Sequence, residues 1–182
     1  MGQKILFIAA THGNEKIGVK VMKQLEENGF KPNWIIGNKK AFKQNKRFID
    51  VDLNRSAPGS PKAKEYEKRR AWEILKLASK FKYVIDIHGT VSGSGIFTII
   101  TNPKIENLIF AASLPIKNIV IWVAKKSEVM NPLSEYFPRG LEIECGPKNS
   151  KKIRTNLKKI IINILKNNRD INNANKKNIF QG

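Results

Sequence analysis

Two apolar segments, each ending in a histidine followed by a glycine, constrain this sequence more than any other feature. The run at residues 5–10 leads into Thr11-His12-Gly13-Asn14-Glu15, and the run at residues 83–87 leads into His88-Gly89. A short apolar run followed by turn residues is typical of a buried strand. Because ligands of open α/β sheets gather at the carboxyl ends of the strands, we predict that both histidines lie at one edge of a sheet.

The first of these segments contains a candidate pair of metal ligands. His12 and Glu15 are three residues apart on a strand-to-helix turn, and we expect Gly13 to let the backbone bend sharply between them. A catalytic zinc usually takes one more protein ligand and keeps an open position. The sequence has only one other histidine, His88, so we predict a metal site formed by these three side chains. Two ordinary hydrogen-bonded loop histidines are the alternative.

Strand and helix patterns alternate along the chain. We expect strands at residues 4–10, 34–37, 82–88, 96–101, 118–123 and 140–147, and helices at residues 16–28, 62–80, 104–113 and 150–166. This alternation predicts a single α/β domain with a mostly parallel sheet and helices on both faces. The polar segment 38–61 is expected to be a long functional loop, residues 125–138 to be irregular, and the Asn- and Lys-rich tail from Asn167 to be disordered.

Composition limits the classes of protein that need to be considered. A chain of 182 residues suits one domain with a sizeable core. No apolar run is long enough to span a bilayer, and no signal pattern precedes residues 5–10. The single cysteine, Cys145, fits a reducing, cytoplasmic compartment. The formal net charge of +19 permits binding to anionic partners, but the lysines are scattered and no nucleic-acid-binding motif is present. We therefore interpret the charge mainly as solvated surface.

A metal held by two histidines and a glutamate activates water and polarises a carbonyl. Amide hydrolysis then needs a carboxylate for proton transfer, a cation facing the developing oxyanion, and a donor fork for a substrate carboxylate. Glu144 ends a strand, as the metal ligands do, and period-two alternation places Glu142 on the same face. Arg47, Asn54 and Arg55 in the long loop are the candidates for binding anions.

Two aspartates are candidates to hold the ligand histidines in place. Asp52 can accept the second ring N–H of a ligand histidine and fix its tautomer. Asp86, two residues before His88 on the same strand face, is a second candidate for this task. Ordinary structural tasks remain open for all of these residues: ion pairs with surplus lysine or arginine, a solvated loop, or a turn-forming aspartate.

Five sequence segments give the chain a family resemblance. They are Thr11-His12-Gly13-Asn14-Glu15, Arg47-Phe48-Ile49-Asp50-Val51-Asp52-Leu53-Asn54-Arg55, Tyr66-Glu67-Lys68-Arg69-Arg70-Ala71, Asp86-Ile87-His88-Gly89-Thr90 and Ile143-Glu144-Cys145-Gly146-Pro147. In this order and spacing the chain resembles the aspartoacylase/succinylglutamate desuccinylase family of zinc-carboxypeptidase-like hydrolases. The resemblance implies a carboxypeptidase-like α/β fold with a mixed sheet between helices.

The resemblance also implies a function for each candidate side chain. The three metal-ligand candidates would bind one Zn²⁺ per chain. Glu144 would be the general base and acid, and Arg47 would face the scissile carbonyl and its oxyanion. Asn54 and Arg55 would hold a carboxylate of an N-acyl amino acid.

The chain departs from the family in two respects. Family members of known activity are longer and carry a C-terminal β-rich domain, whereas we expect a single zinc-hydrolase domain at residues 1–166 and a tail at residues 167–182. Members of the aspartoacylase type also have an arginine upstream of the catalytic glutamate. Here Ser134 stands at that position, and Arg139 lies nearer as a possible substitute. A preference for N-acetylaspartate is therefore not implied.

The sequence thus predicts a zinc-dependent amide hydrolase that removes the acyl group from a small N-acyl amino acid, or cleaves a short peptide with a carboxylate. A minimal metallocarboxypeptidase or peptide amidase with the same site is the alternative within enzymes, favoured by the open face that the absent domain would leave. The alternative from another class is a basic protein that binds nucleic acid or anions on an inactive scaffold. We do not expect a membrane or nucleic acid as the natural partner.

Overall fold

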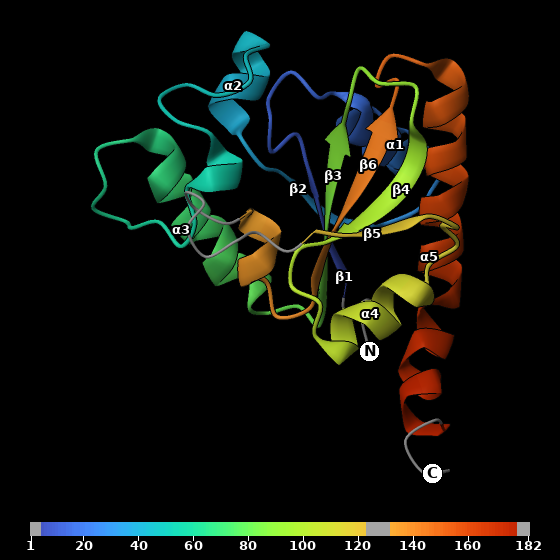
Figure 1. The fold of residues 1–182 in the computed structure, drawn as a ribbon. Coiled ribbons are helices and arrows are strands. Elements are labelled where there is room, and N and C mark those ends of the chain that lie inside the picture. The colour runs from blue at the N-terminus through green and yellow to red at the C-terminus, as the bar shows by residue number, and fades with distance from the viewer. Residues whose placement is uncertain (1–4, 123–131, 178–182) are drawn as a thin grey trace.

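The computed structural model describes residues 5–122 and 132–177, and its centre is a six-stranded sheet (Figure 1). The strands are β1 Ile5–Ala9, β2 Asn33–Ile36, β3 Tyr83–Gly89, β4 Gly95–Ile100, β5 Ile119–Ile121 and β6 Gly140–Gly146. They lie in the order β2-β1-β3-β6-β4-β5. The first four in this order are parallel, while β4 runs antiparallel to β6 and parallel to β5. The predicted mixed, mostly parallel sheet is confirmed.

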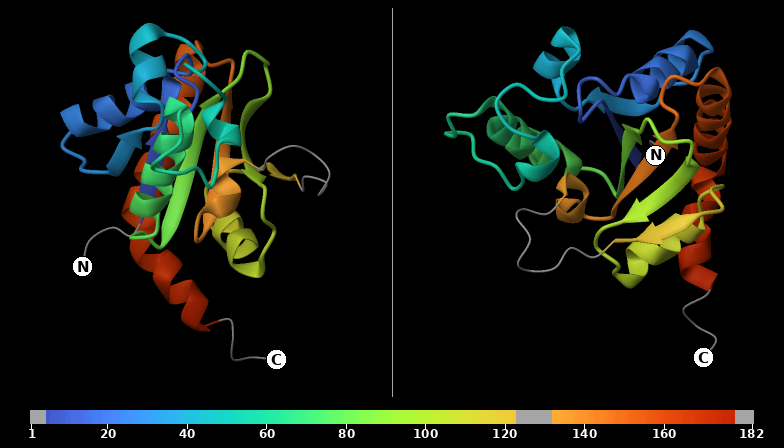
Figure 2. Two further views of the ribbon diagram at one scale, coloured as in Figure 1. Left: turned by 90° about the vertical axis from the view of Figure 1, so that its left-hand side faces the viewer. Right: turned by 45° about the horizontal axis from the view of Figure 1, so that its top comes forward.

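Helices cover both faces of the sheet, also as predicted. They are α1 Ile17–Glu27, α2 Lys39–Gln44, α3 Tyr66–Ala78, α4 Ile105–Ala112 and α5 Lys151–Lys177, with short 3₁₀ turns η1 Leu53–Arg55 and η2 Leu133–Tyr136. In Figure 1 the sheet lies between α3 on the left and α5 on the right, and Figure 2 shows the same layers from two further sides. The helices α1, α4 and α5 share one apolar core, and α3 shares the other with both 3₁₀ turns.

The continuous apolar run of β1 follows from its position between these two layers. Ile5 and Phe7 pack into the core with α1 and α5, whereas Leu6 and Ile8 pack into the core with α3. Because both faces of a central parallel strand are buried, apolar residues are needed at every position rather than at alternate ones.

The predicted long loop at residues 38–61 contains α2 and η1, so the prediction was wrong for these two elements. The side-chain oxygen of Asn38 accepts a hydrogen bond from Ala41 N at 3.0 Å and begins α2. Asn45, with a left-handed φ of 53°, ends it. Only Ala41 is buried within α2, so the sequence has no apolar stripe that would reveal a helix.

Other element boundaries also differ from the prediction. Helix α3 begins at Tyr66 rather than at residue 62, and α5 continues to Lys177 through most of the segment expected to be a tail. Between Leu165 and Lys177 the only apolar residues are Ile171 and Ala174, so the sequence pattern gives little sign of this continuation. Residues 123–131 and 178–182 lie outside the described residues, as does much of the expected irregular segment 125–138. In the part that is described, no helix has the length and apolarity needed to cross a membrane.

Candidate functional site

Three side chains meet where β1 and β3 end. These strands pair in parallel, with Ala9 opposite Ile87, so His12 and His88 come from adjacent strand ends. His12 Nδ1 lies 2.9 Å from Glu15 Oε1, and His88 Nδ1 lies 3.2 Å from Glu15 Oε2. One ligand atom from each of the three residues lies within 4.8 Å of the others. Two imidazole nitrogens and a carboxylate are a donor set that suits zinc and similar divalent ions.

The backbone around these ligands is held by close approaches. Glu15 Oε2 also accepts a hydrogen bond from Gly89 N at 2.9 Å. Gly13 packs directly on α2, where a Cβ atom would lie 2.2 Å from the carbonyl carbon of Ala41. Residues 11–14 form a bend and a turn, in line with the sharp bend expected at Gly13, and the left-handed backbone next to it is at Ala10, with φ of 57°. Gly13 is thus needed for the close approach of α2 to the turn.

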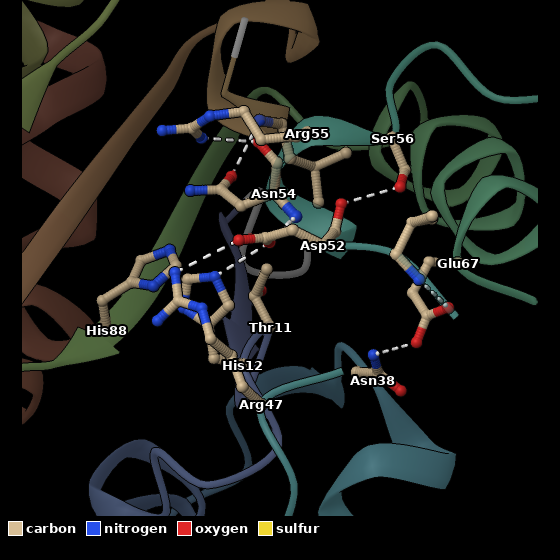
Figure 3. Close-up of polar contacts among 12 residues, drawn as sticks. Thr11, His12, Asn38, Arg47, Asp52, Asn54, Arg55, Ser56, Glu67 and His88 are labelled. Carbon is tan, nitrogen blue, oxygen red and sulfur yellow. Dashed lines mark hydrogen bonds and ion pairs between the residues drawn. The ribbon is translucent and has the colours of Figure 1, made fainter. Parts of the chain in front are cut away.

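The second nitrogen of each histidine ring faces an aspartate. His12 Nε2 lies 3.0 Å from Asp52 Oδ1 (Figure 3). His88 Nε2 lies 3.1 Å from Asp86 Oδ2, although it forms no hydrogen bond of good geometry within the described part of the chain. Thr11 Oγ1 donates to both oxygens of Asp86, at 2.8 and 2.9 Å. These contacts orient both rings so that their Nδ1 atoms face Glu15.

Contacts between the histidines and the carboxylates of the site shift the pKa values of both kinds of group. Burial lowers the pKa of His12, but hydrogen bonds with Asp52 and Glu15 outweigh it and raise the pKa. Burial also lowers the pKa of His88. The negative charge of Asp86 and the hydrogen bond between His88 and Glu15 outweigh burial and raise this pKa well above its usual value. Burial would raise the pKa values of Glu15 and Asp52, but their hydrogen bonds to the histidines lower both. The carboxylates thus favour positive charge at the imidazoles, as protons or as a metal ion.

Glu142 and Glu144 of β6 share one face of the sheet, as predicted, and the β3–β6 register places His88 on that face too. Their surroundings differ. Glu144 is opposite His88 in the β3–β6 register. Its Oε2 atom is buried without a hydrogen-bond partner among the described residues. Burial, together with the charges of Glu15 and Glu142, raises the pKa of Glu144. Glu142 instead accepts a hydrogen bond from Ser134 Oγ at 2.8 Å. Of the two, Glu144 is the one with a buried oxygen that accepts no hydrogen bond from the described residues.

The predicted anion-binding residues occupy different places around the three candidate metal ligands. Arg47, half-exposed, lies 3.1 Å from Asp52 Oδ2 and 3.7 Å from Glu15 Oε1. Arg55 donates to Asn54 O at 2.7 Å, and its guanidinium lies 5.5 Å from the Trp122 ring centre. Figure 3 shows Asn54 and Arg55 on the same side of Asp52.

The side chain of Asn54 is buried and bonded within the protein. Its Oδ1 atom accepts a hydrogen bond from Leu133 N at 2.9 Å, and its Nδ2 atom lies 3.5 Å from Glu142 Oε1. These contacts tie η1 to η2 and β6. The structure therefore brings Arg47 and Asp52 directly to the metal-binding side chains, whereas Asn54 faces the neighbouring polar contacts of Glu142.

The two positions considered for the family's upstream arginine do not supply one to the site. Ser134 is buried, donates to Glu142 and lies 3.0 Å from Thr101 Oγ1. The carbonyl oxygen of Arg139 accepts a hydrogen bond from Val84 N, and its guanidinium lies 6.0 Å from the Tyr83 ring centre. Both contacts are at the start of β3, opposite to the end that carries His88, so the suggestion that Arg139 substitutes was wrong.

Sequence reasoning missed Thr11 and Glu67 as members of the site. Glu67 belongs to the buried stripe of α3, which consists of Glu67, Arg70, Ala71, Ile74 and Ala78. Trp72 on the same helix is, by contrast, 36% exposed. A charged residue at helical spacing from buried alanine and isoleucine is a signal that Glu67 is buried with partners.

Most of the chain is similar in sequence to known proteins. The sequence profile of the Succinylglutamate desuccinylase/Aspartoacylase catalytic domain matches residues 1–167. A "Probable aspartoacylase" of Prochlorococcus marinus (strain AS9601) is 34% identical over 162 residues, covering 79% of this chain and 54% of the relative. One of Trichodesmium erythraeum (strain IMS101) is 30% identical over 163 residues, covering 79% and 56%. The chain spans about half the length of these curated relatives.

Solved structures show the same fold. Murine aminoacylase 3 aligns with a TM-score of 0.70 at 21% identity, covering 91% of this chain and 64% of that chain. The succinylglutamate desuccinylase from Chromobacterium violaceum aligns with a TM-score of 0.69 at 20% identity, covering 90% and 60%. At these identities the structural similarity establishes a common architecture.

Proposed function

Because the chain belongs to the succinylglutamate desuccinylase/aspartoacylase family, we propose that it is a zinc-dependent hydrolase that removes an acyl group from an N-acyl amino acid. The observation that carries this proposal is the convergence of His12 Nδ1 and His88 Nδ1 on the two oxygens of the Glu15 carboxylate. The names of the family and of the relatives support the class of substrate. A cytoplasmic location, which the single cysteine fits, is part of the proposal.

His12, Glu15 and His88 would hold the zinc ion. When bound, a zinc ion at such a site lowers the pKa of water and polarises a carbonyl group. Glu144 takes the proton from the attacking water and passes it to the leaving nitrogen. Its buried Oε2 atom, which has no hydrogen-bond partner among the described residues, and its raised pKa support this assignment, because the group that accepts the proton must later donate it.

The arginines act on the substrate. Arg47, beside Glu15 and Asp52, faces the scissile carbonyl and stabilises the negative charge that develops on its oxygen. Arg55 binds the carboxylate of the amino-acid part through its planar fork of donors. Asn54 supports this side of the site, because its carbonyl oxygen accepts a hydrogen bond from Arg55.

The test is a screen of N-acyl amino acids and short peptides against the zinc-loaded protein. Release of a free amino group from an N-acyl amino acid, abolished by a chelator and restored by zinc, is the expected result. Preferential cleavage of peptides would favour a carboxypeptidase or peptide amidase instead. Stoichiometric zinc binding without hydrolysis of any member of either set would contradict the proposal.

A further inference from the structure

Helix α3 contributes a buried carboxylate, Glu67, that the proposed chemistry does not use. Its relative exposure is 0%. Oε1 accepts hydrogen bonds from Asn38 Nδ2 at 2.9 Å and from Ile49 N at 2.7 Å. Oε2 accepts hydrogen bonds from Asp50 N at 3.0 Å and from Val51 N at 3.3 Å. In Figure 3 Glu67 lies on the opposite side of Asp52 from the two histidines.

These four hydrogen bonds offset the free-energy cost of burying the Glu67 carboxylate. A carboxylate removed from water is tolerated when its oxygens accept several hydrogen bonds. Three of the four donors are consecutive backbone amides, so Glu67 fixes the path of the chain at residues 49–51. A further hydrogen bond joins the loop to the first residue of α3: Asp50 Oδ2 accepts from Tyr66 N at 2.7 Å.

The segment fixed in this way lies between the site residues of the loop. Arg47 is two residues before Ile49, and Asp52 directly follows Val51. Asp52 in turn contacts both Arg47 and His12 Nε2, at 3.1 and 3.0 Å. Residues 45–52 lie outside the strands and helices. Besides the contacts with Glu67, Arg47 O accepts a hydrogen bond from Gly13 N at 3.0 Å, which holds the beginning of the segment but not Ile49–Asp52.

We propose that Glu67 is a positioning residue that sets the placement of Arg47 and Asp52 against the metal-binding side chains. This inference rests on the proposed function for its catalytic consequence, but the placement of the loop is a separate property. Glu67 acts through the loop backbone and touches none of His12, Glu15 and His88. Its loss therefore impairs substrate binding and turnover while the metal ion is retained.

The substitution Glu67→Gln tests this with almost no change in volume. Each oxygen of Glu67 accepts two N–H groups. Whichever way the glutamine amide is turned, its NH₂ group faces two donors and loses two of the four bonds. We expect kcat/KM to fall about 10- to 100-fold, the usual range for residues that support a metal site, with one zinc ion per chain retained. Amide hydrogen exchange should accelerate at Ile49, Asp50 and Val51.

Glu65→Gln, at the N-cap position of the same helix, is the matched control. Glu65 is partly exposed and pairs with Lys68 at 2.9 Å. Its variant should match the wild type in kinetics, metal content and exchange. Asn38→Ser provides a milder variant in case Glu67→Gln folds poorly. Serine retains a cap for α2 but removes the Nδ2 donor to Glu67, so it should show the same pattern with a smaller loss.

Two results would overturn the inference. One is an amide hydrogen exchange rate at Ile49–Val51 that is the same in Glu67→Gln as in the wild-type protein. The other is acceleration of exchange throughout the protein together with loss of zinc, because that result would give Glu67 a general structural task. If the wild-type protein hydrolyses no substrate, the proposed function fails. The inference about Glu67 would still be supported if Glu67→Gln keeps its zinc and its amide exchange is accelerated only at residues 46–55.

Discussion

The two halves of the candidate site are built in different ways. His12, Glu15 and His88 come from β3 and from the turn after β1, whose paths are set by parallel strand pairing. Arg47 and Asp52 come from a loop outside the sheet, held by hydrogen bonds from Ile49–Val51 to Glu67 on α3 and by one from Gly13 N to Arg47 O. The proposed metal-binding half and the proposed substrate-facing half are therefore built separately, so variants should affect metal binding and turnover independently.

The largest expected effect is loss of the metal in variants of the strand-end half. His12→Ala or His88→Ala removes one of three protein ligands and should abolish stoichiometric zinc binding. Arg55→Ala should keep one ion per chain, because Arg55 belongs to the other half. The check is metal analysis of the dialysed proteins. Equal metal loss in all three variants would mean that the substitutions damage the fold as a whole.

Glu144→Gln should lower kcat about 10²- to 10⁴-fold, the range usual for loss of a general acid–base group. The amide is close in shape but cannot accept the proton from water. Zinc content should be unchanged, since Glu144 lies outside the ligand cluster. Steady-state kinetics with an N-acyl amino acid provides the check. Turnover close to wild type would remove Glu144 from its proposed task.

The arginines should separate turnover from binding within the loop half. Arg47→Ala should lower kcat about 10²- to 10³-fold, as for loss of a group that stabilises an oxyanion. Arg55→Ala should mainly raise KM, because a contact with a remote carboxylate is made equally in the ground and transition states. The reverse assignment of these two effects in kinetics would require the arginines to exchange tasks.

Zinc affinity should rise with pH and then level off. Contacts with Asp52, Asp86 and Glu15 raise the pKa values of His12 and His88 above the ordinary imidazole value. Without metal, the rings therefore keep protons to higher pH, and zinc must displace them. Below the raised pKa values, each displaced proton costs about tenfold in affinity per pH unit. Calorimetry in buffers of different ionisation enthalpy measures the proton release, and a pH-independent affinity would contradict this electrostatic description.

The smallest expected effect concerns the contact between the two halves. Gly13→Ala forces a Cβ atom to within 2.2–2.6 Å of the backbone of Ala41 and Phe42. Such overpacking should lower the free energy of unfolding by about 1–3 kcal/mol. Gly93→Ala is the control, since nothing lies within 4 Å of its Cβ position, and it should change stability by less than about 0.5 kcal/mol. Similar denaturation midpoints for both variants would show that α2 moves freely.

The strand-end half was largely predictable from the sequence. Apolar runs that end in His12 and His88 indicate strands, and the carboxyl-end rule places both histidines at one edge of the sheet. Glu142 and Glu144 follow from strand alternation. The close packing of Gly13 on α2 was not predictable, because it depends on a contact with residues nearly thirty positions further along the chain.

The loop half was predictable in residue type but not in arrangement. The sequence singled out Arg47, Asp52, Asn54 and Arg55, yet it gave neither α2 nor the turn η1 that contains Asn54 and Arg55. The loop residues are held in place by the buried carboxylate of Glu67 on α3 and by contacts of Asn54 with η2 and β6. Such long-range hydrogen bonds leave no periodic pattern in the sequence.

Anomalous X-ray diffraction from crystals of the zinc-loaded protein tests the central claim most directly. We expect one zinc ion per chain, about 2.0–2.2 Å from His12 Nδ1, His88 Nδ1 and an oxygen of Glu15. An ion bound elsewhere, or absent from this cluster at saturating zinc, would contradict it.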